Sequence, residues 1–331
     1  GLDSAVADVA RPRSIAELVE RGDVLVSTVG PFARFGAPAV HAAIAAGAHY
    51  IDSTGEPGFI RDVFERFGPE AQSAGSGLLT AMGYDYVPGN LAGGLALREA
   101  GEDAVRVDIG YFASAATAGQ LSGGTRASAA GIFTEPVHGF RDGRIVSERA
   151  ARHVREFEVS PAAAGTGDLR RPHTRQAISI GATEQFALPR VHPELRDVGV
   201  WLGWFGPASR PLQVMSAATE LATKLPGVRG AIGAVSGRLV KGSSGGPDAR
   251  ARAKARSQIV AVASDRAGIP LVTVQLDGAN PYDFTGAMLA WSAMRAADGG
   301  LRGSGALGPV DGFGLDELEV GAREAGIERS P

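Results

Sequence analysis

Residues 23–56 read DVLVSTVGPFARFGAPAVHAAIAAGAHYIDSTGE, and the prediction of the fold starts from this stretch. Val24–Val26 is a short apolar run of the kind that forms a strand buried on both faces. The alanine-rich segment after it has an apolar helical face, and Gly47 is suited to the left-handed conformation that ends a helix. Tyr50 and Ile51 begin a second strand. The stretch therefore predicts two parallel strands joined by a helix.

Each of these strands ends in a turn of small or polar residues, and both turns must lie at the same edge of a parallel sheet. In open α/β sheets this carboxyl edge is where ligands bind. A tight turn or a helix cap would use the same residue types. We expect the second turn both to cap the helix that begins at Pro57 and to bind a ligand. The predicted ligand-binding residues are Ser27, Thr28, Val29, Gly30 and Pro31 in the first turn and Asp52, Ser53, Thr54, Gly55 and Glu56 in the second.

The segment VSTVGPFARFGAPAVHAAIAAGAHYIDSTGE resembles the saccharopine dehydrogenase-like oxidoreductases, in the back half of their NAD(P)-binding domain. MGYDYVPGNLAG, at Met82–Gly93, resembles the turn by which that family leaves its last Rossmann strand. The resemblance spans roughly residues 1 to 100 and extends more loosely over the remainder. It implies NADP or NAD as the cofactor and hydride transfer as the activity. The family includes trans-acting enoyl reductases of lipid assembly, so the substrate implied is a small molecule or an acyl group.

The resemblance begins partway through the nucleotide-binding domain. Nothing before Asp23 supplies the glycine-rich turn that holds the pyrophosphate, its helix and the strand that selects the ribose. A smaller α/β fold without that turn is the alternative. We expect a fragment that lacks about one βαβ unit, roughly 30 residues or more, at its amino end. Such a fragment by itself is expected to bind no dinucleotide.

The remaining pattern divides the chain into two parts. Before residue 100 we expect a strand at Ala5–Val9, helices, and another strand at Leu78–Ala81, all in one parallel sheet. From Ala104 the apolar residues alternate with polar ones, and Asp142-Gly143 is a strong hairpin signal. The predicted fold is α/β: a doubly wound, Rossmann-like parallel sheet lacking its first βαβ unit in residues 1–100, and a mixed α+β substrate domain with C-terminal helices in residues 101–331.

A third turn, after the strand at Leu78–Ala81, carries the candidate catalytic residues. Gly83 is expected to contact the cofactor, and Tyr84 and Asp85 are expected to face the crevice between the domains. A tyrosine can donate a proton, and an aspartate can orient it or accept a proton. A tyrosine that packs at a domain hinge explains the same residues. No lysine is placed for a Tyr-x-x-x-Lys pair with Tyr84.

A glycine-rich segment in the second part is the candidate substrate site. Free N–H groups at a helix start, with an arginine beside them, can hold a carboxylate or a thioester carbonyl. A capped helix with a solvated arginine is the structural alternative. The residues of this predicted substrate site are Ser122, Gly123, Gly124, Thr125 and Arg126.

Composition limits the classes of function. The net charge of −3 and the lack of a strongly basic segment argue against nucleic acid as the main partner. The chain has no cysteine, which excludes disulfides and thiolate catalysis, and His41, His49 and the other histidines show no metal-ligand spacing. No apolar run of about 18 residues is present, so no transmembrane segment is expected.

The combined prediction is a cytoplasmic NAD(P)-dependent oxidoreductase that acts on a small-molecule or acyl substrate, without a metal, with a homodimer as the expected assembly. An amino-acid dehydrogenase of the saccharopine type and an enoyl reductase of lipid biosynthesis both fit this class. A binding or scaffold protein that has kept the fold without the chemistry is the alternative outside it.

Overall fold

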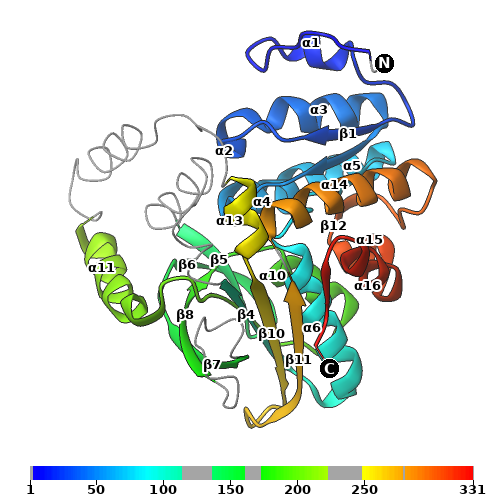
Figure 1. The fold of residues 1–331 in the computed structure, drawn as a ribbon. Helices are drawn as coiled ribbons and strands as arrows, with labels where there is room; N and C mark the ends of the chain where they lie inside the picture. The colour runs from blue at the N-terminus through cyan, green and yellow to red at the C-terminus, as the bar shows by residue number, and fades with distance from the viewer. Residues whose placement is uncertain (1–2, 114–135, 161–172, 223–247, 279, 331) are drawn as a thin grey trace.

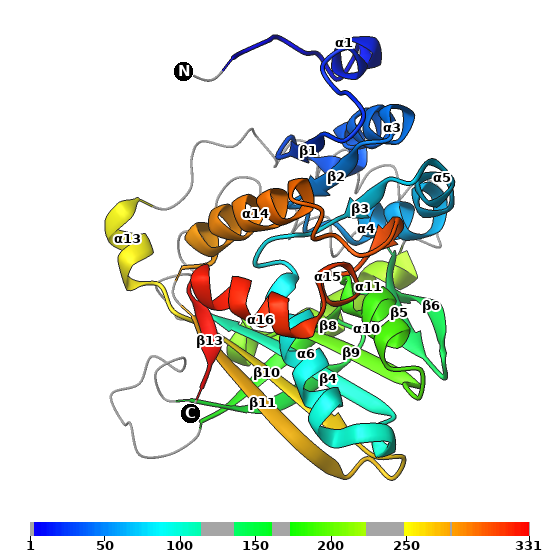
Figure 2. The same cartoon turned by 90° about the vertical axis from the view of Figure 1, so that its right-hand side faces the viewer.

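The computed structural model describes residues 3–113, 136–160, 173–222, 248–278 and 280–330. Within these residues the chain forms two β-sheets, and the long helix α14 (Pro281–Ala297) lies between them (Figure 1). The view from the side shows the amino-terminal segment beyond the smaller sheet and the last strand beside the larger one (Figure 2).

The smaller sheet is parallel throughout, as the strand–helix–strand pattern predicts. Its strands run in the order β1 (Val24–Ser27), β2 (His49–Asp52), β3 (Gly77–Leu79) and β12 (Gly305–Leu307). The fourth strand comes from the carboxyl-terminal part of the chain and was not predicted, since its glycine-rich sequence has no strand pattern. The parallel sheet is therefore completed by a segment far beyond residue 100.

The strand predicted at Ala5–Val9 does not form. Residues 3–7 have exposed side chains and no ladder, and a turn follows at Val9. The prediction was wrong because a strand needs a neighbour to satisfy its N–H and C=O groups. In the described part of the chain β1 pairs with β2 alone, and Ala5–Val9 does not lie along its free edge.

Short helices connect and cover the parallel strands. Gly47 and Gly75 adopt left-handed φ angles of 70° and 75° at the ends of α3 and α5, as a helix-ending glycine does. The helices of this part are α1 (Pro12–Ala16), α2 (Phe32–Phe35), α3 (Ala37–Ala46), α4 (Pro57–Asp62), the π-helix η1 (Val63–Phe67), α5 (Gly68–Ala74), α6 (Val87–Ala100) and the 3₁₀ turn η2 (Gly101–Asp103).

The larger sheet is mixed, in agreement with the predicted second domain. Its main order is β13 (Ile327–Arg329), β11 (Pro270–Gly278), β10 (Ser257–Ser264), β4 (Arg106–Ala113), β9 (Asp197–Leu202), β5 (Pro136–Arg141) and β6 (Arg144–Arg149). The strands β7 (Val154–Val159) and β8 (His173–Ile180) pair with each other, and β8 also pairs with β9. The hairpin predicted at Asp142-Gly143 joins β5 and β6.

The strand β4 differs from its predicted character. Alternation predicted a half-buried antiparallel strand, yet Val107–Ala113 is buried on both faces. It pairs antiparallel with β10 and parallel with β9. Helix α6 covers one side of this central region. The other helices of the second part are α10 (Glu184–Val191), η3 (Gly206–Ala208), α11 (Ser209–Ala222), α13 (Ala249–Lys254), α15 (Pro309–Phe313) and α16 (Leu315–Glu324).

The two sheets share one hydrophobic core. A single cluster of buried side chains includes Tyr50 and Ile51 from β2, Leu91 and Leu95 from α6, and Ile109 from β4. Burial of apolar surface is the main stabilising contribution to folding. The parallel sheet is thus held against the mixed sheet by the same core, with α6 as the connecting element.

A buried carboxylate joins three strands of the mixed sheet. The Asp108 side chain on β4 is fully buried and accepts hydrogen bonds from Arg106 Nε at 2.7 Å and from Trp201 Nε1 on β9 at 2.9 Å. Arg155 on β7 forms a further ion pair with it. Removing such a carboxylate leaves its cationic partners without compensation.

We therefore predict that Asp108→Ala lowers the free energy of unfolding by roughly 3 kcal/mol, because Arg106, Arg155 and Trp201 all lose their acceptor. Urea denaturation measures the change. The exposed Glu102→Ala variant is the control and should stay within about 0.5 kcal/mol of the parent protein. Equal midpoints for the two variants would contradict the structural role of Asp108.

Candidate functional site

The three predicted turns lie together, because β1, β2 and β3 are adjacent and parallel and each turn follows a carboxyl end. In the first turn Ser27 is buried, while residues 28–31 are exposed. In the second, Ser53, Gly55 and Glu56 are partly exposed. The third turn packs against α14, where Thr285 Oγ1 accepts a hydrogen bond from Tyr84 N at 3.0 Å.

Asp52 is fully buried and holds the second and third turns together. Its carboxylate accepts hydrogen bonds from Thr54 N and Ala81 N, both at 2.9 Å, and from Thr80 Oγ1 at 2.9 Å. Burial raises the pKa of Asp52 to about 6, while these donors act in the opposite direction. Asp52, predicted to bind a cofactor, is thus bonded to its own protein. Its contribution to a ligand site is to shape the turns.

Glu56 ties the first turn to the second. Its two carboxylate oxygens accept hydrogen bonds from Phe32 N at 2.8 Å and Ala33 N at 2.9 Å, at the start of α2. Thr54 Oγ1 accepts from Glu56 N at 3.1 Å. Sequence reasoning expected capping of the helix at Pro57. The structure shows that the Glu56 side chain instead caps α2, which lies across the edge from it.

Asp85 presents an unbonded carboxyl group at this edge. It is partly exposed, and its Oδ2 lies only 3.0 Å from where a Cβ on Gly55 would stand. Among the described residues no hydrogen bond reaches its side chain. Burial raises the pKa of Asp85 to about 6, so the protonated form is populated closer to neutral pH than in a free aspartate. A partly exposed carboxyl group with a raised pKa is of the type that can transfer a proton.

The surroundings of Tyr84 do not suit proton transfer. Only 3% of its surface is exposed, and its hydroxyl is 3.5 Å from the carbonyl oxygen of Phe112. Its ring packs edge-on against Tyr111 and Phe284. Burial is the main reason that the pKa of Tyr84 is raised well above its ordinary value. These contacts favour the hinge-packing interpretation over proton donation.

A buried polar cluster beneath the third turn was not predicted from the sequence. The Tyr111 hydroxyl on β4 lies 2.6 Å from Glu184 Oε1 at the start of α10, and it accepts a hydrogen bond from Gly89 N at 2.9 Å. Asn90 Nδ2 donates to Tyr86 O and to Thr183 Oγ1, both at 2.9 Å. The sequence predicts a strand near Gln176–Ile180, but neither the helix that begins at Glu184 nor the burial of Glu184 below the Asp85 turn.

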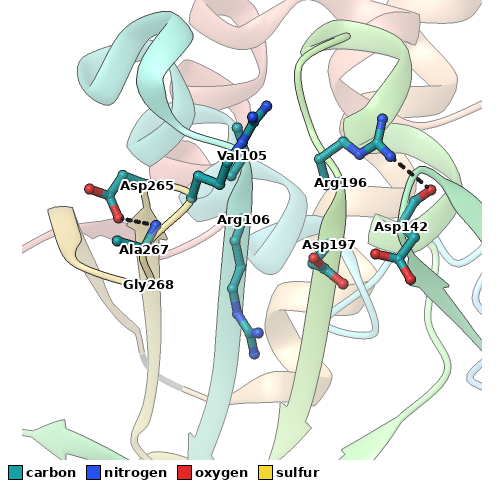
Figure 3. Close-up of a pocket in the computed structure, with 9 residues that line it drawn as sticks. Val105, Arg106, Asp142, Arg196, Asp197, Asp265, Ala267 and Gly268 are labelled. Atoms are coloured by element: carbon teal, nitrogen blue, oxygen red, sulfur yellow. Dashed lines mark hydrogen bonds between the residues drawn. The ribbon is translucent and has the colours of Figure 1, made fainter.

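The predicted substrate segment Ser122–Arg126 lies outside the described residues. A polar pocket of about 610 Å³ lies elsewhere, beside the first residues of β4 and β9 (Figure 3). In it the Arg196 guanidinium donates to the Asp142 carbonyl oxygen at 3.4 Å. Tyr111, which contacts the Asp85 turn, is near the other end of β4, so this pocket is separate from the three turns. Its lining residues are Val105, Arg106, Asp142, Arg196, Asp197, Asp265, Arg266, Ala267 and Gly268.

The histidines named from the sequence have structural surroundings. His49 Nδ1 accepts a hydrogen bond from Gly77 N at 2.9 Å, and the His41 ring packs edge-on against Phe67. In the described residues no group of three or more histidine or acidic side chains is arranged to hold a metal ion. None of the helices seen there is long and apolar enough to cross a membrane.

Comparison with known sequences finds relatives over part of the chain. No protein-family model matches it. A trans-acting enoyl reductase of Mycobacterium ulcerans is 37% identical over 98 residues, which is 30% of this chain and 23% of that protein. A Mycobacterium tuberculosis protein named for the same activity is 40% identical over 86 residues, 26% of this chain and 20% of that protein. The match thus spans about a fifth of the length of these curated relatives.

Comparison with solved structures covers nearly the whole chain. Saccharopine dehydrogenase (L-Glu forming) of Saccharomyces cerevisiae aligns over 98% of this chain and 87% of its own, with a TM-score of 0.54 and 13% identity. Homospermidine synthase of Legionella pneumophila, solved in complex with NAD, aligns over 99% and 80%, with a TM-score of 0.50 and 11% identity. The chain therefore has the fold of saccharopine dehydrogenase, a Rossmann-type parallel sheet with a mixed sheet, and part of its sequence is related to the trans-acting enoyl reductases.

Proposed function

We propose that this protein is an NAD(P)-dependent oxidoreductase that transfers hydride to or from an acyl substrate, as an enoyl reductase does. The observation that carries the proposal is the meeting of three strand-end turns at one edge of a Rossmann-type sheet. Beside them lies the Asp85 carboxyl, which has no hydrogen bond from the residues that the structure describes. The sequence relation to enoyl reductases favours an acyl substrate over an amino acid. Location in the cytoplasm and assembly as a homodimer stay predictions.

The residues at this edge fit the nicotinamide half of a dinucleotide. Residues 28–31 leave an exposed backbone at the end of β1, and a ligand lying there would also meet Ser53 and Gly55. The carboxylates of Asp52 and Glu56 are bonded within the protein, so they keep these turns rigid. Open backbone on a rigid edge is the arrangement by which α/β sheets bind ligands.

Asp85 is the proposed proton-transfer residue. A bound NADPH or NADH supplies the hydride when a carbon–carbon double bond is reduced, and the second carbon then takes one proton. Asp85 is placed at the same edge as the exposed turn and, with its pKa raised to about 6, carries that proton under mildly acidic conditions. Tyr84 packs behind it and, in this proposal, supports the turn.

Cofactor binding at the first turn is tested with Gly30→Val. For every cofactor and turnover measurement the parent protein is the chain extended upstream by the expected strand, glycine-rich turn, helix and strand, because residues 1–331 alone are expected to bind no dinucleotide. A Cβ at residue 30 would meet only the Phe32 ring, at 3.6 Å, so the fold should tolerate the change. The larger side chain should block the open backbone and raise the Kd for NADPH at least about tenfold. Calorimetry measures the Kd, and circular dichroism checks the fold.

The exposed Ala16→Val on α1 is the control for Gly30→Val and should bind NADPH like the parent protein. An unchanged Kd in Gly30→Val would remove the first turn from the site. If the parent protein binds neither NADPH nor NADH at millimolar concentration, the scaffold alternative is favoured over the oxidoreductase.

The chemistry is tested with Asp85→Asn, using a 2-enoyl thioester as the probe and the loss of NADPH absorbance as the signal. Turnover should fall by about a hundredfold or more, because the amide cannot donate the proton. The Kd for NADPH should change little. In the parent protein, turnover should decline as pH rises through about 6, since Asp85 must be protonated to donate.

Tyr84→Phe is the matched variant on the neighbouring residue. The Tyr84 hydroxyl is buried, and its hydrogen bond to Phe112 O is long, at 3.5 Å. Removing the hydroxyl should therefore leave turnover close to that of the parent. A large loss in Tyr84→Phe together with normal turnover in Asp85→Asn would reverse the two assigned roles.

A further inference from the structure

The hydroxyl group of Tyr111 connects the Asp85 turn to a buried carboxyl group. It lies 2.6 Å from Glu184 Oε1, 2.9 Å from Gly89 N and 3.3 Å from Tyr86 O. Tyr86 follows Asp85 directly, so its carbonyl belongs to the turn that presents Asp85. A Cβ on Gly89 would stand 2.1 Å from the Tyr111 oxygen, and the contact therefore depends on glycine at this position.

Counting protons shows that these three contacts cannot all persist in both states of Glu184. A tyrosine hydroxyl has one hydrogen to donate and can accept two hydrogen bonds. Gly89 N always donates to it. When Glu184 is protonated, it donates to Tyr111, and the Tyr111 hydrogen is free to bond Tyr86 O. When Glu184 is ionised, the Tyr111 hydrogen must turn to the carboxylate, and Tyr86 O loses that donor.

We propose that Glu184 is a proton-controlled positioning residue, which when protonated holds the Asp85 turn through Tyr111 and when ionised releases that hold. The proposal rests on the function proposed for Asp85. Asn90 Nδ2 also bonds Tyr86 O, at 2.9 Å, so the released turn loosens without unfolding. Glu184 acts through Tyr111 in this proposal. A weaker contact, from Thr183 Oγ1 to Glu184 Oε2 at 3.5 Å, connects it to Asn90.

The surroundings of Glu184 raise its pKa, so that its ionisation occurs near pH 8. The side chain is fully buried, and burial is the largest cause that raises its pKa to about 8. A negative charge on Asp85 raises it further, while the hydrogen bond from Tyr111 lowers it. Several titratable or charged groups lie on the turn and on the elements packed against α10. They are Asp85, Tyr86, Arg98, Glu99, His138, Arg141, Asp197 and Asp311, with Tyr111 on β4 and Arg190 on α10 itself.

Two neighbouring groups, His138 and Asp311, have pKa values well below 8, so their titration can be distinguished from that of Glu184. Burial lowers the pKa of His138 to about 4, and burial raises the pKa of Asp311 to about 6. Burial raises the pKa values of Tyr86 and Tyr111 well above the ordinary tyrosine value. A spectroscopic change near pH 8 in the Asp85 turn would therefore reflect the ionisation of Glu184.

The carbonyl of Tyr86 can be observed directly, without cofactor or substrate. The sequence contains five tyrosines, and only Tyr86 is followed by a valine. Protein labelled with carbonyl-¹³C tyrosine and ¹⁵N valine therefore gives a single correlated signal, from the Tyr86–Val87 peptide. Its ¹³C shift should titrate with a midpoint near pH 8 in the parent protein, as Tyr86 O loses its donor.

Glu184→Gln is the decisive variant, because the amide donates to Tyr111 at every pH, as the protonated acid does. The Tyr86 signal should then stay constant through pH 8. The free energy of unfolding should also change in its dependence on pH. A folded-state pKa near 8 against an ordinary value of 4.5 means that the parent protein loses stability as pH rises between them. The Glu184→Gln variant should lose less.

Turnover gives the third measurement. In the parent protein it should fall about tenfold per pH unit above pH 8 in addition to the decline caused by Asp85, and Glu184→Gln should remove only this additional fall. Tyr111→Phe should abolish the Tyr86 titration as well. Asp85→Asn should keep the titration but lower its midpoint, because the negative charge of Asp85 raises the pKa of Glu184.

A Tyr86 titration near pH 8 that survives in Glu184→Gln, or no titration in the parent protein, would overturn the proposal. The outcome is independent of cofactor binding. Failure of the proposed oxidoreductase function would appear as missing NADPH binding, whereas failure of this inference would appear in the spectrum of the free protein.

Discussion

The arrangement of the site depends on one buried carboxylate, that of Asp52. It ends β2 and receives hydrogen bonds from Thr54 N, Ala81 N and Thr80 Oγ1, while Asp52 O accepts from Met82 N at 2.7 Å. Leaving a buried donor unpaired costs about 1–3 kcal/mol. The end of β2 and the chain leaving β3 therefore cannot move apart independently, and the turn that carries Asp85 begins from a fixed position.

The carboxyl groups at this edge differ in function because they differ in bonding. Asp52 and Glu56 have their oxygens occupied by backbone N–H groups and hold the turns in place. Asp85 has no such partner in the described residues and remains available to a ligand. Glu184 is buried below and contacts the turn through the Tyr111 hydroxyl. Rigid support beneath a single available group is what a preorganised site requires.

The two sheets are not independent units at the site. Tyr111 is on β4 of the mixed sheet and Glu184 is on α10, which packs against that sheet. Both lie close to Gly89 at the first turn of α6, which follows the parallel sheet. The same hydrophobic core runs through both sheets, and β12 returns from the carboxyl-terminal part to pair with β3. A change in the polar cluster is therefore transmitted to the parallel-sheet edge over a few bonded groups.

The sequence alone determined the parallel unit and the place of its turns, because apolar runs and glycine stops at Gly47 and Gly75 are local signals. It also placed Asp85 in the turn after β3, where its catalytic role stays a prediction. Tertiary structure decided that Ala5–Val9 finds no partner strand, that Glu56 caps α2, and that Glu184 lies beneath the Asp85 turn. These outcomes depend on contacts between residues far apart in the chain, which strand and helix periodicity does not encode.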